Sequence, residues 1–293
     1  MTTFVVDRGV KNGLEKTISY LMPMLFALLI VLVFYSMNTG YFMQGVSFLF
    51  SPDFSKLTAQ SVLTAMGHAF FTLSLGMGAI MVYGSYLPQD TSIAKASILI
   101  ALADTVVALL AGLVIFPIVF ANSLEPGAGP GLIFQTLPIA FGQMEAGILI
   151  GTLFFLLLVF AAWTSSISLI EPAVTWLVEN HGMNRIYASV FIGMTTWFVG
   201  LGSMLSFNVW SEHRLFGLNF FDFLDYLTAN IMLPLGGLFI VIFAGWLMKT
   251  EASKNELNTT KTGSNVWLIL SRFIASMAVM VVFYSAIGVI NLG

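Results

Sequence analysis

The chain has 293 residues, of which 58% are hydrophobic and only 9% are charged, and it contains no cysteine. A mean hydropathy of +0.94 excludes an ordinary soluble domain, and the lack of cysteine excludes a disulfide-stapled secreted scaffold. The net charge of −3 forms no basic stripe that could follow a phosphate backbone, so we expect no nucleic-acid partner. These properties predict an integral membrane protein in contact with the lipid bilayer.

Apolar runs long enough to cross a bilayer recur along the whole chain. About 20 apolar residues are needed to span a hydrocarbon core of roughly 30 Å. We therefore predict an all-α, polytopic transmembrane bundle that forms a single transmembrane domain over residues 1–293. Its seven predicted helices span residues 18–38, 61–87, 93–121, 147–178, 186–206, 221–248 and 265–290.

Lysine and arginine are distributed unevenly between the two ends of these helices, which predicts the orientation. Most of them fall on the side of the N-terminus, whereas Lys56 and Arg214 lie on the opposite side and Arg272 lies within the last helix. This bias predicts a multi-pass protein of the cell (inner) membrane with a cytoplasmic N-terminus. Seven crossings would then place the C-terminus outside.

The second predicted helix contains the stretch FFTLSLGMGAI, residues 70–80. Thr72, Ser74, Gly76 and Gly78 lie about halfway along it, where an unpaired backbone group in lipid costs several kcal/mol. The two glycines allow the helix to unwind, which would free backbone groups to bind a ligand in a protein-lined cavity. Close helix packing through small residues remains the alternative. We predict a break at residues 74–78.

The third predicted helix carries Asp104 in the run ILIALADTVVALLAG. A carboxylate at this depth is costly unless it meets a cation, a proton or a polar cavity. We therefore expect a functional role for Asp104, and we expect it to point toward the same midplane cavity as Thr72 and the Thr164/Ser165 pair.

The connection at residues 122–146 is rich in Gly and Pro, yet it contains the apolar stretches LIF and LPIAF. Such a segment is typical of an extracellular lid loop that dips back toward the protein.

The fourth predicted helix contains FAAWTSSISLIEP, in which Ala161, Thr164 and Ser165 are spaced i, i+3 and i+4 on one face. Hydroxyl oxygens and an accessible carbonyl are hard, neutral donors that suit an alkali cation. A packing seam of small hydroxyl residues is the alternative.

Four stretches together resemble the neurotransmitter:sodium symporters, the LeuT-type family that includes bacterial sodium-dependent transporters. FFTLSLGMGAIMVYGSY, AAWTSSISLIEPAVTWL and FDFLDYLTANIMLPLGG look like the sixth, eighth and tenth helices of that family, and GLIFQTLPIAFGQM looks like its fourth extracellular loop. The resemblance implies a LeuT-type fold. It also implies that the chain corresponds to helices five to eleven and lacks the first four.

The resemblance assigns roles to individual residues. It implies a first sodium site with Thr72 and Asp104, and a second with the carbonyl of Ala161 and the hydroxyls of Thr164 and Ser165. The residues implied to contact an apolar amino acid are Phe71, Leu73, Ser74, Met77 and Leu169. The residues implied to act in gates are Asp225 outside, and Glu179 and Tyr86 inside.

Three positions depart from the pattern or lack a role. His68 stands where the family often has Gln, and we expect a buried hydrogen-bonding residue rather than a proton carrier. Ala108 stands where chloride-dependent relatives have Ser, and the charge of Asp104 makes chloride dependence unexpected. Glu171 precedes Pro172 and has no assigned role, so it could simply cap or kink the helix.

The resemblance implies a fragment of a symporter that couples sodium to an amino acid or related small amine by alternating access. Sodium would be the transported ion, with no organic cofactor. The chain alone would not transport, and a second polypeptide could supply the first four helices. The alternatives are a non-transporting remnant or subunit of a split transporter, and an intramembrane enzyme using Asp104, His68 and Ser74. No HExxH or GxSxG motif supports an enzyme.

Overall fold

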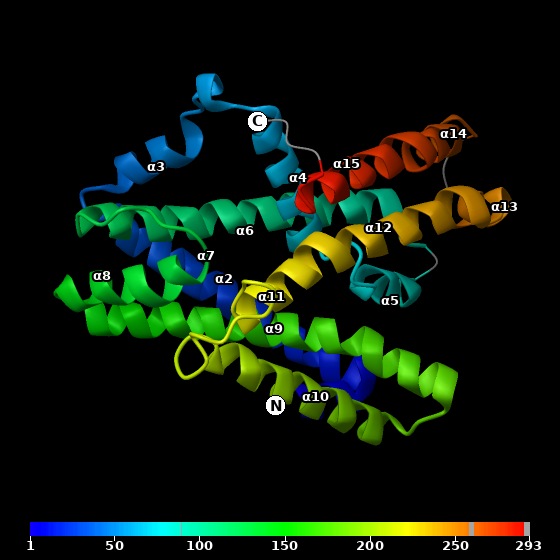
Figure 1. The fold of residues 1–293 in the computed structure, drawn as a ribbon, viewed down its shortest axis with the longest axis horizontal. Helices are drawn as coiled ribbons and strands as arrows, with labels where there is room; N and C mark the ends of the chain where they lie inside the picture. Colours follow the sequence, from blue (N-terminus) through cyan, green and yellow to red (C-terminus); the bar gives the residue numbers. More distant parts are fainter. Residues whose placement is uncertain (89, 258–260, 290–293) are drawn as a thin grey trace. The chain divides into compact units, whose positions relative to one another are not determined.

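The protein is all-helical in a computed structural model that describes residues 1–88, 90–257 and 261–289 (Figure 1). The α-helices in chain order are α1 Thr2–Asp7, α2 Lys16–Met37, α3 Phe42–Phe50, α4 Ala59–Thr72, α5 Ala79–Ser85, α6 Ile93–Ala121, α7 Gly129–Gly131, α8 Leu137–Gln143, α9 Gly147–His181, α10 Arg185–Leu205, α11 Phe220–Asp225, α12 Leu233–Ile242, α13 Thr250–Leu257, α14 Lys261–Ile269 and α15 Ser276–Ala286. The π-helical segments are Val10–Glu15, Leu132–Thr136, Tyr226–Met232, Phe243–Leu247 and Leu270–Ala275. A 3₁₀ turn covers Phe54–Lys56.

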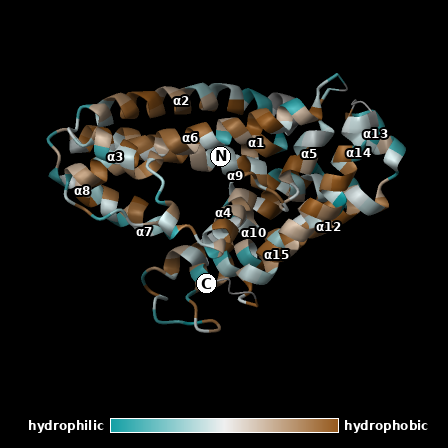
Figure 2. Cartoon of the chain, turned by 90° about the horizontal axis from the view of Figure 1, so that it is seen from above, coloured by the Kyte–Doolittle hydropathy of each residue, from teal (hydrophilic) through white to brown (hydrophobic). Residues whose placement is uncertain are grey.

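Six helices within the described residues are long and apolar enough to cross a membrane. They are Gly13–Met37, Ile93–Ala121, Gly147–His181, Arg185–Leu205, Phe220–Leu247 and Thr262–Ala286. Figure 2 shows hydrophobic residues along most of α2 and α6. The seventh predicted span, residues 61–87, is absent from this set because it is divided into α4 and α5, each too short to cross alone.

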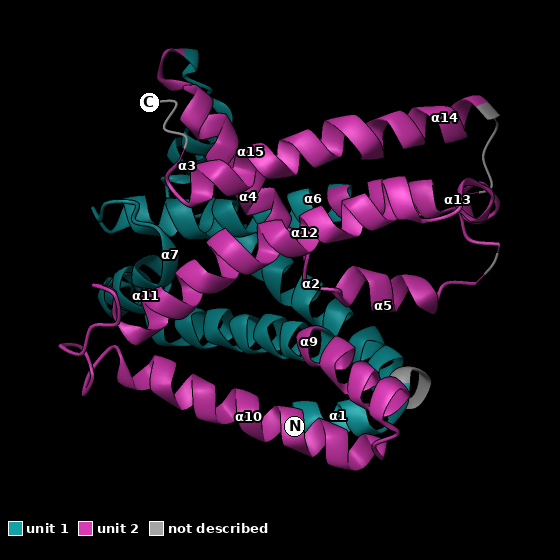
Figure 3. Ribbon diagram, turned by 45° about the vertical axis from the view of Figure 1, so that its right-hand side comes forward, with its two compact units in different colours: residues 1–54, 102–168 teal, residues 55–101, 169–293 magenta. Residues whose placement is uncertain are grey.

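The helices group into two compact units, drawn in different colours in Figure 3. Unit 1 comprises Met1–Phe54 and Leu102–Ser168, and unit 2 comprises Ser55–Ala101 and Leu169–Gly293. Helix α9 contributes its first part to unit 1 and its last part to unit 2.

Unit 1 has an apolar core to which the connection at residues 122–146 contributes. Leu137 and Ala140 of α8 are fully buried, and Phe141 packs its ring 5.6 Å from that of Phe154 in α9. Three residues of the apolar stretch LPIAF therefore lie in the core of unit 1, whereas Ile139 is 52% exposed. Its role as an extracellular lid remains a prediction.

Helix α3 was not predicted, because its nine residues are too few to register as a span. It packs against α6 within unit 1, where the ring of Phe48 lies 4.6 Å from that of Phe116. A Cβ on Gly45 would meet Pro117 Cγ at 2.6 Å, so the glycine permits this close approach. The contact holds α3 against the proline of α6.

Unit 2 contains the interrupted helix. Helices α4 and α15 both pack against α12, and α10 packs against α11. Residues of α12 and α15 lie beside the break between α4 and α5, which is the feature most relevant to function.

Candidate functional site

Helix α4 ends in the middle of an apolar stretch through a specific turn. Leu75 N–H donates to Phe70 O at 2.9 Å, and Ser74 N–H donates to Phe71 O at 3.0 Å. These two bonds form the Schellman arrangement, in which the residue after the C-cap adopts the left-handed conformation. Ser74 occupies that position with φ of 53°, although glycine is usual there. The predicted break at residues 74–78 is confirmed.

Gly76 and Gly78 serve the break in different ways. Both have positive φ, 83° and 80°, which only glycine adopts without strain. A Cβ on Gly76 would meet Leu233 O at 2.3 Å and Gly237 N at 2.9 Å, so the break lies directly on the backbone of α12. Gly78 has open space around it and forms the left-handed N-cap of α5. Unwinding and close packing through a small residue thus both occur here.

The break leaves carbonyl groups without a backbone partner, of which the one of Gly76 lies against Gly236 of α12. Within the described chain, the hydrogen bonds that close the turn accept at Ala69, Phe70 and Phe71. The carbonyls of residues 72–77 receive no backbone donor there. Thr72 donates its hydroxyl only weakly to Ala69 O, at 3.5 Å. Unpaired carbonyls at this depth require a cavity, a cation or a ligand.

A cavity of about 590 Å³ in unit 2 adjoins α4. It brings together Phe71 and Asp225, two of the predicted site residues, with His68 and Asn230. His68 is exposed and makes no hydrogen bond among the described residues, so the expectation of a buried, hydrogen-bonding histidine is wrong. Gln60 and Ser285 also line it, joined by a hydrogen bond of 3.4 Å from the Gln60 amide nitrogen. The cavity therefore has a polar wall beside the aromatic ring of Phe71.

A second cavity, of about 240 Å³, shares Phe70 with the first and is almost entirely apolar. Ser74, Gly76 and Gly78 line it with residues of α12 and α15. The structure thus places Phe71 and Ser74 in different cavities of unit 2. Among the remaining predicted substrate contacts, Leu73 is the C-cap of α4, Met77 lies in the break and Leu169 is half exposed on α9.

The predicted hydroxyl face on α9 belongs to unit 1. Thr164 Oγ1 lies 3.1 Å from Phe160 O and 2.9 Å from Ala161 O, and either carbonyl can take its hydrogen. If the hydrogen points to Phe160 O, the oxygen of Thr164 and one lone pair of Ala161 O are both available to a cation. Ser165 is exposed beside them.

Asp104 lies on α6 and also belongs to unit 1, whereas Thr72 belongs to unit 2. Asp104 is partly buried and has no hydrogen bond or ion pair among the residues that the structure describes. Whether Asp104 and Thr72 share one cavity remains a prediction.

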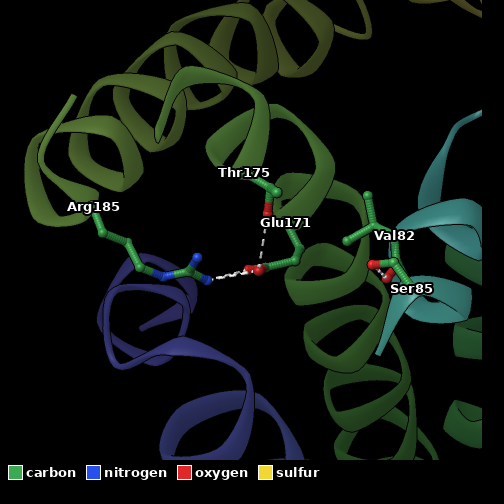
Figure 4. Close-up of polar contacts among 5 residues, drawn as sticks. All are labelled: Val82, Ser85, Glu171, Thr175 and Arg185. Atoms are coloured by element: carbon green, nitrogen blue, oxygen red, sulfur yellow. Dashed lines mark hydrogen bonds and ion pairs between the residues drawn. The ribbon is translucent and has the colours of Figure 1, made fainter. Parts of the chain in front are cut away.

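The predicted inner-gate residues are exposed, but a neighbouring acid is paired. Tyr86 ends α5 and Glu179 lies in the last turns of α9. Glu171, in contrast, is fully buried and accepts hydrogen bonds of 2.6 and 2.7 Å from Arg185 Nη2. Thr175 donates to the same carboxylate at 3.2 Å (Figure 4).

The Glu171–Arg185 pair replaces the expectation that Glu171 merely caps or kinks the helix. It joins α9 to the first residue of α10 across the turn in which Asn184 caps α10. The signal available in the sequence was an acidic residue within a predicted span, fourteen residues before an arginine. A charge pair that is held by three hydrogen bonds fixes this end of the helical hairpin.

The fold and the break define the class of protein. Several apolar spans and a helix interrupted at mid-length, with free carbonyls and polar side chains beside it, are features of multi-pass secondary transporters. The membrane location follows from the spans themselves.

Comparison with known proteins identifies the family. Residues 1–292 match the sodium:neurotransmitter symporter family, and the chain belongs to it. It is 38% identical to the uncharacterized sodium-dependent transporter YhdH of Bacillus subtilis, over 99% of this chain and 65% of that protein. It is 37% identical to an uncharacterized sodium-dependent transporter of Haemophilus influenzae, over 96% of this chain and 62% of that protein.

A solved structure is similar as well. MhsT in complex with L-phenylalanine superposes with a TM-score of 0.86 at 42% identity, over 97% of this chain and 65% of MhsT. The chain thus spans just under two thirds of the length of these relatives. Since the family consists of sodium-dependent transporters, the chain is a transporter family member and not an enzyme.

Proposed function

We propose that this chain supplies sodium-binding and substrate-binding residues to a symporter that moves an apolar amino acid by alternating access. The observation that carries the proposal is the break between α4 and α5, with unpaired carbonyls at residues 72–77 beside the Thr72 hydroxyl. Interrupted helices of this kind bind substrate and ions near the bilayer midplane in secondary transporters. The L-phenylalanine in the similar MhsT structure supports an apolar or aromatic amino acid as substrate.

Sodium would bind at two places. Thr72 and Asp104 would contribute to the first site, and Ala161, Thr164 and Ser165 to the second. The hydrogen-bond choices of Thr164 support the second site, because its hydroxyl can point to Phe160 O and leave neighbouring oxygens free for the cation. The partly buried, unpaired Asp104 supports the first site, because a carboxylate within a membrane span needs a cation or proton.

The substrate would contact Phe71, Leu73, Ser74, Met77 and Leu169. Asp225 would act at the outer gate, and its place in the cavity lined by Phe71 supports this. Tyr86 and Glu179 would act at the inner gate. Coupling would arise because sodium and substrate bind one arrangement of the helices better than the other.

A chimera provides the test: this chain replaces the matching part of MhsT, and the product is reconstituted into proteoliposomes. We expect phenylalanine uptake that is driven by an inward sodium gradient. Thr164→Ala and Ser165→Ala should each raise the sodium concentration needed for half-maximal uptake. The control Val159→Ala, at an exposed position of the same helix, should leave it unchanged.

The proposal fails if uptake by the chimera is independent of sodium. It also fails if both hydroxyl variants keep the sodium dependence of the unmodified chimera. The same measurement with other labelled amino acids would define the substrate class.

A further inference from the structure

Arg272 is a cation inside the last apolar span, Thr262–Ala286. It lies in the π-helical segment Leu270–Ala275, which packs against the π-helical segment Phe243–Leu247 of the preceding span. Its Nε–H donates a hydrogen bond to Gly245 O. A Cβ on Gly245 would meet Arg272 Cγ at 3.2 Å, so the glycine gives the arginine stem room beside the backbone. The side chain is thereby held at the level of Gly245.

On the preceding span this level is near the end of the apolar stretch, whereas on its own span, Thr262–Ala286, Arg272 is the eleventh of 25 residues. Lys249, four residues after Gly245, begins the polar sequence KTEASKNEL, so the apolar stretch ends about one helical turn, ~5 Å, beyond the anchor. Trp246 is 55% exposed, and its ring lies 5.5 Å from the guanidinium carbon of Arg272. Tryptophan and arginine at such a position are typical of the headgroup region.

The guanidinium has donors to spare. Arginine carries five N–H donors, and the hydrogen bond to Gly245 uses one. In the described part of the chain, Arg272 makes no ion pair and no second hydrogen bond. A cation beside hydrocarbon is costly without an anion, and phosphate oxygens can accept from a guanidinium in pairs.

A groove of about 360 Å³ starts at Arg272 and follows the two spans inward, where α12 and α15 run side by side (Figure 1). Its walls are apolar apart from Arg272 and Ser276 and include Leu238, Ile242, Phe273, Met277 and Met280. Met280 lies eight residues beyond Arg272. At 1.5 Å per residue the groove is about 12 Å long, close to the ~15 Å of hydrocarbon in one leaflet.

We propose that this groove binds one anionic phospholipid, with its phosphate on Arg272 and one acyl chain along Met277 and Met280. Three features select this occupant: a cation without an ion pair beside the end of the preceding span, the apolar walls and the length that is close to that of one leaflet. The inference does not depend on the proposed transport function, because every residue that it uses lies outside the sodium and substrate sites.

The test uses the delipidated, purified chain in detergent, to which equimolar phosphatidylglycerol and phosphatidylcholine are added. Native mass spectrometry then measures how much of each lipid is bound. We expect a preference for phosphatidylglycerol of about fivefold, the contribution of one basic residue near an anionic headgroup. Arg272→Gln should remove the preference, and Arg272→Lys should keep part of it. Lys95→Gln, an equal charge change at an exposed position away from the groove, should leave the preference intact.

Met277→Trp fills the groove without changing charge and should lower the binding of both lipids. If Arg272→Gln cannot be purified, the lipid binding of Met277→Trp tests whether the groove is occupied by a lipid. Free glycerol phosphate, which has the headgroup chemistry but no acyl chain, should not displace the lipid.

The proposal is overturned if Arg272→Gln keeps the preference or if glycerol phosphate competes as well as the whole lipid. It is also overturned if Met277→Trp changes only the oligomeric state, because a second copy would then be the occupant.

Discussion

Replacing Gly76 by Ala should be far more harmful than the same change two residues later. Ala at a φ of 83° costs about 1–2 kcal/mol. The new Cβ would also lie 2.3 Å from Leu233 O, and relieving such overpacking costs about 1–3 kcal/mol more because backbone must move. Gly78→Ala carries the conformational cost alone, since nothing lies near its Cβ position. We therefore expect losses of about 2–5 and 1–2 kcal/mol respectively.

Thermal unfolding of the purified variants in one detergent measures this difference. At about 2–4 °C per kcal/mol, Gly76→Ala should lower the midpoint by roughly 4–20 °C and Gly78→Ala by roughly 2–8 °C. Gly84→Ala serves as a control, because Gly84 lies in α5 with open space and ordinary helical φ. Equal midpoints for Gly76→Ala and Gly78→Ala would refute the claim that the break rests on the backbone of α12.

Three further results are expected. Glu171→Gln should cost about 2–3 kcal/mol, a small loss for a broken buried ion pair, because the Arg185 side chain is 25% exposed. Adding Arg185→Gln to the same chain should recover part of the lost unfolding midpoint. Strictly additive effects of the two substitutions would contradict the pairing. Ser74→Gly should raise the midpoint by a few degrees, since it relieves a left-handed residue worth about 1 kcal/mol; an unchanged or lower midpoint would argue against that strain. In the MhsT chimera, Asp104→Asn should raise the sodium requirement for uptake at least about tenfold, while exchange of chloride for gluconate should change nothing; a chloride requirement would show that the charge of Asp104 does not act as proposed.

The break in the interrupted helix was predictable from sequence for a simple reason. Two glycines and two hydroxyl residues within an apolar run are poor choices for a continuous span, and the structure places the break there. The family was predictable from four stretches, which include this one and the hydroxyl face of α9. In both cases each signal is local, because every stretch is recognised from residues a few positions apart.

Features that depend on contacts between distant segments could not be predicted. The approach of Gly76 to Leu233 requires α12 to lie against the break, and periodicity alone does not say which helix packs where. The pair of Glu171 with Arg185 was missed because the local sequence explains each residue separately. Glu171 precedes a proline, and Arg185 is a basic residue in a predicted loop. Helix α3 was missed because a search for spans ignores short helices.

The π-helical segments determine where a one-residue deletion can leave the buried face of a helix unchanged. Ser271 and Val279 are both buried and are eight residues apart, which on an uninterrupted α-helix would place them about 80° out of phase. Ser271 lies in the π-helical segment Leu270–Ala275, which absorbs one extra residue before Val279, so the two positions face the same way. Deletion of one residue in that segment would convert it to plain α-helix and keep the inward face intact. The same deletion in α15 before Val279 would turn the remainder by about 100° and bring Val279 and Val282 out of the core.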